Sequence, residues 1–318
     1  MNMKIPALSV IITALCLASA IECAAAAVSL PWSTSFNTSG QCNDWTQANG
    51  LSGTQVNCDN LTGWGSWTCD DSGVPGTNGA AGTGPFHEEQ ITSSANNPAG
   101  GGGKGQRHWK GWNGTNSPNA TNNSGGLSID FAAVQPELWV RWYMRYQAGF
   151  KWANIIEDKI IYFDVVSTQT SVIVAWQGYG TGSDTSKILA QSGGSQTFIS
   201  SAGKGWDGTM GGAASDGLWH YYEVHLKMNT SGANGMAEMW IDGIQTVSAA
   251  SVDWRPGGTG SYLTGWNYVL FGSNSRSPDN SYACAYADFD DITISNTGYI
   301  GPLGGLAKPQ APVLSTIP

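Results

Sequence analysis

Charge is scarce in this sequence, and basic charge is the scarcest. Only 12% of the 318 residues are charged, and 14 lysines and arginines stand against 23 aspartates and glutamates, for a net charge of −9. Ordinary domains carry about 25% charged residues. Because nucleic-acid binding requires a basic footprint, the composition argues against a nucleic-acid partner.

Long apolar runs are missing after the first 27 residues. That leader has Lys4 near its start, an apolar stretch over 5–20, and small residues around Ala20 and at 25–27 where cleavage can occur. No later segment approaches the roughly 20 apolar residues of a membrane span. The sequence therefore predicts a signal peptide at 1–27 and a secreted, soluble protein, which we expect to be a monomer with no membrane partner.

Cysteine is rare, and no pair has the Cys-x-x-Cys spacing of a zinc site. Of six cysteines, Cys16 and Cys23 lie in the predicted leader. The four that remain are Cys42, Cys58, Cys69 and Cys284. An even number in an oxidising compartment predicts two disulfides, and all three possible connectivities stay open.

Helical periodicity is also absent, and short strand-like runs are separated by turns rich in Gly and Asn. This pattern predicts an all-β fold, a two-sheet antiparallel β-sandwich (jelly roll) with long loops. We expect one domain over 28–301 and, from its Pro, Gly and Ala content, a flexible tail over 302–318.

The run WVRWYMRYQ at 139–147 predicts a strand whose two faces differ. Val140, Trp142, Met144 and Tyr146 form the face expected to be core. Trp139, Arg141, Tyr143 and Arg145 form the other. Arginine binds carboxylates through two parallel hydrogen bonds, and aromatic rings stack on sugars, so the second face is a candidate site for acidic carbohydrate. The alternative is an exposed strand whose arginines lie over neighbouring rings.

Two further runs, at 217–229 and 235–247, predict the arms of a hairpin joined by the turn TSGANG. Alternation places Trp219, Tyr221, Glu223, His225 and Lys227 on one face of the first arm. Glu238, Trp240 and Asp242 share a face of the second.

The segments GLWHYYEVHLKMN, NGMAEMWIDG and FDDITIS together resemble the concanavalin A-like lectin/glucanase superfamily. The strand at 139–147 and the Gly-rich loop before it resemble a subset that includes glucuronan and alginate lyases and their lyase-like relatives. The resemblance spans roughly 100–300. It is incomplete, because the Tyr-x-Lys-Ala-Gly box of alginate lyases is absent. Gln106-Arg107-His108, loosely similar to their Gln-x-His, precedes the arginine strand instead of following it.

This resemblance implies a polysaccharide lyase that cleaves a uronic-acid glycan by β-elimination. The reaction needs a group to neutralise the carboxylate, a base, and an acid for the leaving oxygen. Arg141 and Arg145, aided by Gln177, suit the first role, with Lys159 and Lys227 as further cations. His225 or His108 suits the base, and Tyr143 or Tyr221 the acid. The residues expected to contact sugar are Trp139, Gln177, Glu223, Lys227, Trp240 and His108. We expect Arg141, Tyr143, Arg145, Glu223, His225 and Lys227 to converge on the concave sheet.

Three alternatives remain. A carbohydrate-binding protein without catalysis would use the same aromatic residues for stacking. A glycoside hydrolase would need Glu223 and Glu238 as a carboxylate pair across the hairpin, about 5 Å apart. A disulfide-linked structural or adhesive protein is the third. Independently of function, Glu223, His225 and Lys227 could form a solvated strand face with one cross-strand ion pair.

A structural calcium ion is a further expectation, since oxygen ligands are abundant. The candidate ligands are Asp70, Asp71, Asp288, Asp290 and Asp291, with Asp290 preferred as a strand residue near both chain ends. The alternative is that these acids are surface charge.

Overall fold

The structure is a computed structural model of the whole chain. It describes residues 27–37, 89–111, 121–122, 127–149, 155–165, 170–179, 185–192, 195–201, 215–271, 275–276 and 284–304. Residues 1–26 of the predicted signal peptide, Cys42, Cys58, Cys69, Asp70, Asp71 and residues 305–318 of the predicted tail lie outside these ranges.

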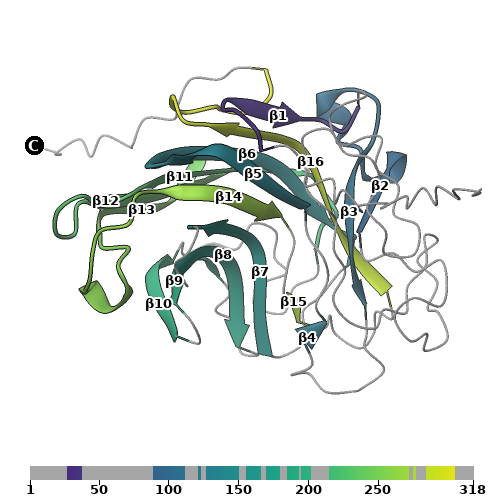
Figure 1. Cartoon of the computed structure of the whole chain (residues 1–318). Helices are drawn as coiled ribbons and strands as arrows, with labels where there is room; N and C mark the ends of the chain where they lie inside the picture. Colours follow the sequence, from purple (N-terminus) through teal and green to yellow (C-terminus); the bar gives the residue numbers. More distant parts are fainter. Residues whose placement is uncertain are drawn as a thin grey trace, which may run out of the picture.

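Two antiparallel sheets form a sandwich (Figure 1). The eight-stranded sheet runs β13 (Ile244–Val252), β12 (Gly235–Ile241), β11 (His220–Lys227), β6 (Glu137–Tyr146), β16 (Cys284–Ser295), β3 (Gly105–Gly111) and β2 (Glu89–Thr92), and β1 (Trp32–Thr34) pairs with β16. The six-stranded sheet runs β10 (Ser195–Ser201), β9 (Thr185–Ser192), β8 (Thr170–Tyr179), β7 (Ile155–Asp164), β14 (Trp266–Phe271) and β5 (Leu127–Gln135). Strands β4 (Thr121–Asn122) and β15 (Ser275–Arg276) form a separate pair.

The only helical elements in the described ranges are short 3₁₀ turns: η1 (Ser93–Ala95), η2 (Pro98–Gly100) and η4 (Pro256–Gly258). Within those ranges no helix has the length and apolar character to span a membrane. The prediction of an all-β, two-sheet antiparallel sandwich is confirmed.

The core lies between the sheets and follows the alternation of β6. Val140, Trp142, Met144 and Tyr146 are fully buried, as predicted for this face. The Trp142 ring stacks on Tyr222 of β11 at a centroid distance of 5.3 Å and meets Phe271 of β14 edge-on at 6.0 Å. These rings join the two sheets, because β14 belongs to the six-stranded one.

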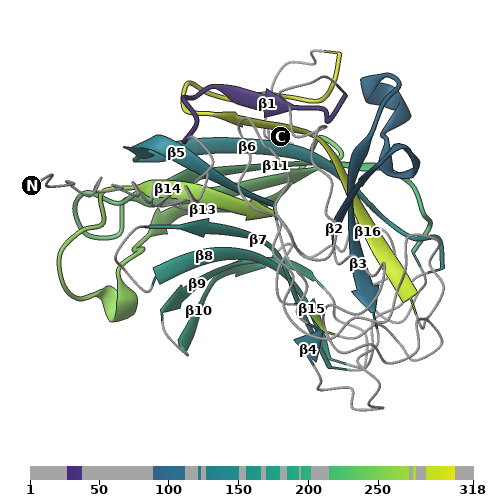
Figure 2. The same ribbon diagram turned by 45° about the vertical axis from the view of Figure 1, so that its right-hand side comes forward.

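Strands β7 and β8 arch strongly, and the inside of the arch faces away from β6 and β11 (Figures 1 and 2). The concave outer face of the sandwich is therefore formed by the six-stranded sheet. We call this surface the curved face. The outer face of the eight-stranded sheet, which carries Arg141 and Arg145, is called the arginine face.

The predicted hairpin of 217–229 with 235–247 needs one correction. β11 and β12 do pair as its arms, but the second arm is not a single strand. Asp242 and Gly243 have positive φ values of 50° and 79° and form a tight turn that sends the chain back as β13. The sequence Asp-Gly is a common signal for such a turn.

Candidate functional site

The arginine face brings together most of the predicted site residues. β6 and β11 are neighbours, and three register pairs align Arg141 with Glu223, Tyr143 with Tyr221, and Trp139 with His225. On the other side of β11, Trp240 aligns with Glu223 and Glu238 with His225. The alternation that the sequence predicted is confirmed. The face is nevertheless not the concave one, since β6 and β11 belong to the eight-stranded sheet.

The middle of the arginine face is covered by the chain's own segment 299–303. The backbone N–H groups of Ile300 and Gly301 donate to the two carboxylate oxygens of Glu223 at 2.8 and 2.9 Å. The backbone N–H of Leu303 donates to the phenol oxygen of Tyr143 at 2.9 Å. Glu223 is fully buried, so this segment occupies the place where a sugar would have to lie.

Arg141 and Tyr221, also in the middle of this face, are bonded within the protein as well. Arg141 donates through Nη2 to the Thr293 hydroxyl at 2.7 Å and through Nη1 to the Gly301 carbonyl at 3.3 Å. The Tyr221 hydroxyl donates to Glu223 in a short hydrogen bond. Burial raises the pKa of the Glu223 carboxyl and of the Tyr143 and Tyr221 phenols. Each of these three groups is therefore harder to ionise than it would be in water.

Aromatic rings flank the covered region. Tyr299 meets Trp139 and Trp240 edge-on, at centroid distances of 5.9 and 5.7 Å. Trp139 is 7% exposed and Trp240 is 1% exposed. Both predicted sugar-stacking rings therefore pack against the chain's own Tyr299.

His225 lies between two carboxylates at one end of the arginine face. Its Nδ1 is 2.7 Å from Glu238 and its Nε2 is 2.8 Å from Glu137. The ring stacks on Trp139 at 3.8 Å, and Lys227 lies 3.5 Å from Glu137. With both ring nitrogens bonded, His225 would have to give up a partner before it could accept a proton from a substrate.

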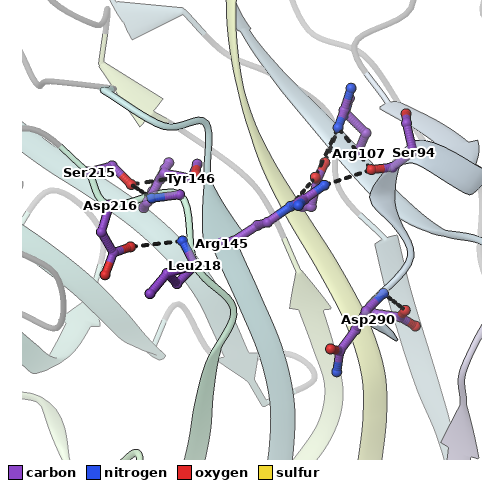
Figure 3. Close-up of polar contacts among 11 residues, drawn as sticks. Ser94, Arg107, Arg145, Tyr146, Ser215, Asp216, Leu218 and Asp290 are labelled. Atoms are coloured by element: carbon purple, nitrogen blue, oxygen red, sulfur yellow. Dashed lines mark hydrogen bonds and ion pairs between the residues drawn. The ribbon is translucent and has the colours of Figure 1, made fainter. Parts of the chain in front are cut away.

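Arg145 lies at the opposite end, in a cluster with a second guanidinium (Figure 3). Asp288, fully buried, accepts Arg107 Nε at 2.7 Å and Nη2 at 2.9 Å, and accepts Arg145 Nε at 2.8 Å. Both arginines also donate to the Ser94 carbonyl of η1. Arg107 was not among the predicted site residues. Its partner Asp288 lies 181 positions away, and local patterns do not reveal such a pairing.

Asp290, the preferred calcium ligand, is held by backbone donors. Its two oxygens accept the N–H groups of Asn97 and Asp291, each at 2.7 Å. Burial, joined by repulsion from Asp291 and Asp288, raises the pKa of the Asp290 carboxyl to about 8. Carboxylate oxygens suit calcium. The described residues contain no group of three or more His, Cys, Asp or Glu that could hold a metal, so calcium stays a prediction.

Two predicted residues, Lys159 and Gln177, do not join the arginines. They lie on β7 and β8 of the six-stranded sheet, where Lys159 pairs with Ala175 and Gln177 with Glu157. The expectation that Gln177 aids Arg141 and Arg145 is therefore wrong, because the three belong to opposite sheets. His108 lies on β3, beside Ala287 of β16 and two strands away from β6.

The curved face carries polar residues that the sequence analysis did not single out. The Tyr268 hydroxyl of β14 donates to Asp164 of β7 at 2.9 Å. Tyr162, Asp164 and Tyr268 all keep partial exposure, whereas Ile173, which pairs with Tyr162 on the adjacent strand β8, is buried. Burial, with the Asp164 charge, raises the pKa of the Tyr268 phenol. In the sequence, only the alternation of residues in KIIYFDVV (159–166) could have indicated that Tyr162 and Asp164 share one face of a strand.

Register places further polar residue types on neighbouring strands of the six-stranded sheet. Ala175 of β8 pairs with Lys159 on one side and with Lys187 of β9 on the other. Two residues along β8, Gln177 holds the equivalent place between Glu157 and Thr185. Two lysine positions and a glutamine position thus lie on three adjacent strands of one sheet.

Comparison with known proteins gives similarity of structure alone. No family model and no curated protein matches the sequence. Alginate lyase Aly36B is 13% identical with a TM-score of 0.42, over 66% of this chain and 97% of that chain. Alginate lyase vAL-1 from Chlorella virus is 15% identical with a TM-score of 0.44, over 66% and 89%. A cellulose-induced protein, Cip1, is 15% identical with a TM-score of 0.39, over 66% and 85%. Similarities of this size carry no argument about the activity of this chain.

Proposed function

We propose that this protein is a secreted polysaccharide lyase that cleaves a uronic-acid glycan by β-elimination, and that it binds the glycan on the curved face. The observation that carries the proposal is the alignment of Lys159 and Lys187 on either side of Ala175, in the same sheet as the hydrogen-bonded pair Tyr268 and Asp164. This arrangement offers cations, a phenol and a carboxylate on one concave sheet.

The chemistry divides among these groups. The ammonium of Lys159 neutralises the sugar carboxylate, which acidifies the adjacent C–H bond. Tyr268 is the candidate proton donor to the leaving oxygen, because a phenol is protonated at neutral pH. Asp164, bonded to that phenol, is the candidate proton acceptor.

The arginine face is less suited to glycan binding than the curved face, because it is covered by the protein itself. Glu223, Tyr143 and Arg141 are bonded to segment 299–303, so a glycan there would have to displace the protein's own chain. Tyr162, Asp164 and Tyr268 on the curved face keep part of their surface exposed.

The test is ultraviolet absorbance of the unsaturated product, followed on a panel of uronans. Wild type should give a rising signal that Lys159→Ala loses, while Lys104→Ala, at an exposed loop lysine, retains it. Loss in Arg141→Ala with full activity in Lys159→Ala would move the site to the arginine face. Retention on a glycan gel with no ultraviolet signal on any uronan would leave a carbohydrate-binding protein without catalysis.

A further inference from the structure

The Arg107–Asp288–Arg145 cluster carries more positive than negative charge. Two guanidinium groups share one carboxylate, which leaves a net charge of +1 on three residues. Asp288 is fully buried, whereas the Arg145 side chain is 24% exposed. Arg145 is therefore the more exposed of the two cations in this cluster.

Arg145 also keeps donor capacity. Its Nε donates to Asp288 and its Nη2 to the Ser94 carbonyl at 2.6 Å. Among the described residues, no acceptor is bonded to its Nη1. Figure 3 shows the side chain extending from β6 toward Ser94 and Arg107, away from Asp216. Those two bonds fix the guanidinium in place, so the entropy cost of ordering it for a ligand has already been met.

An aromatic surface adjoins this donor. The Arg145 guanidinium lies 4.9 Å from the centroid of the Trp219 ring, which is partly exposed. Leu218, the preceding residue, is 62% exposed. A partly exposed ring with a fixed guanidinium over it offers an acidic sugar an aromatic surface to pack against and a donor for its carboxylate.

We propose that Arg145 and Trp219, supported by Arg107 and Asp288, form a second glycan site that binds the carboxylate and ring of an acidic sugar. The site lies on the eight-stranded sheet, apart from the curved face. It holds polymer without cleaving it, because no proton donor or acceptor of the proposed reaction lies in it. It goes beyond the proposed function and does not depend on catalysis.

The test is affinity electrophoresis in gels containing alginate, polygalacturonate or a neutral glucan. The protein carries Lys159→Ala, so that a lyase activity does not degrade the gel. We expect retention on an acidic polymer that weakens with salt, and about tenfold weaker binding when Trp219→Ala is added. Arg145→Lys keeps the positive charge but removes the planar guanidinium with its paired N–H donors, so it should give an intermediate loss of binding. Thermal melting identifies any variant that fails to fold.

Two results would overturn the proposal: unchanged retention in the folded Trp219→Ala variant, or equal retention on neutral glucan. The ultraviolet assay on a short oligosaccharide, run with Trp219→Ala in an otherwise wild-type chain, should match wild type. Retention that depends on Trp219, without any lyase signal, would sink the proposed catalysis and leave this site standing. A lyase signal together with retention that does not depend on Trp219 would support the proposed catalysis and overturn this site.

Discussion

The Glu223 carboxylate accepts the backbone N–H of Gly301 at 2.9 Å, although 78 residues separate them in the chain. Ile300 donates to the other oxygen of the same carboxylate. A buried acid that the sequence marks as a candidate sugar ligand thus ties the end of the described chain onto β11.

This relationship predicts that Glu223→Gln loosens the C-terminal segment. Glutamine keeps one acceptor oxygen but turns an NH₂ group toward a backbone donor. We expect the free energy of unfolding to fall by about 1–3 kcal/mol. Urea denaturation measures the loss, and limited proteolysis should cut near 299–303 faster. Glu137→Gln, at a side chain 38% exposed, is the control and should lose about 1 kcal/mol or less. Equal losses in both variants would contradict the assignment.

The same segment shows where sequence reasoning reached its limit. Alternation in 139–146 correctly separated Arg141 and Tyr143 from the core residue Trp142. The covering contacts come from the backbone N–H groups of Ile300 and Leu303. Because every residue except proline has a backbone N–H, the residue types at these positions do not predict the contacts.

The order of the strands in the two sheets could not be predicted from the sequence either. Lys159 has the same chemistry as the cations grouped with Arg141, but β7 pairs with β8 and β14 and so belongs to the opposite sheet. Pairing between distant strands depends on the whole topology, and local patterns predict the existence of a strand better than its neighbours.

Asp290 should make stability depend on pH. Its folded-state pKa of about 8 exceeds the usual carboxyl value of about 3.9, so between those pH values the folded chain holds a proton that the unfolded chain has released. The free energy of unfolding should therefore fall as pH rises from 5 to 8, by up to about 1.4 kcal/mol per pH unit from this group. Thermal melts in chelator across that range measure the slope.

Asp290→Asn is the matched variant, and it should flatten the slope. Asp288 and Asp291 shift in the same direction, so part of the dependence remains. Added calcium, if Asp290 binds it, favours the ionised carboxylate and should raise the melting temperature most at pH 8. Superimposable pH curves for wild type and Asp290→Asn would contradict the raised pKa.

Gly105 should tolerate no side chain. A Cβ there would lie 1.9 Å from the Ala95 carbonyl oxygen of η1, so Gly105→Ala must push η1 away from β3. We expect a loss of about 1–3 kcal/mol in chemical denaturation. Gly102→Ala is the control, because nothing lies within 4 Å of its Cβ position. A neutral Gly105→Ala would show that η1 does not pack against β3 in solution.

Tyr268 should be required for turnover if the curved face is catalytic. Tyr268→Phe removes only the hydroxyl, and with it the proton donor to the leaving oxygen. We expect product formation to slow by about 10²–10⁴-fold, since a positioned general acid contributes that much. The lost hydrogen bond to Asp164 should cost only about 1 kcal/mol of stability, so the variant stays folded at 25 °C. Tyr262→Phe, at a tyrosine in the loop after β13, controls for loss of a hydroxyl elsewhere. An unchanged rate in Tyr268→Phe would remove this phenol from the reaction, whatever the fate of Lys159→Ala.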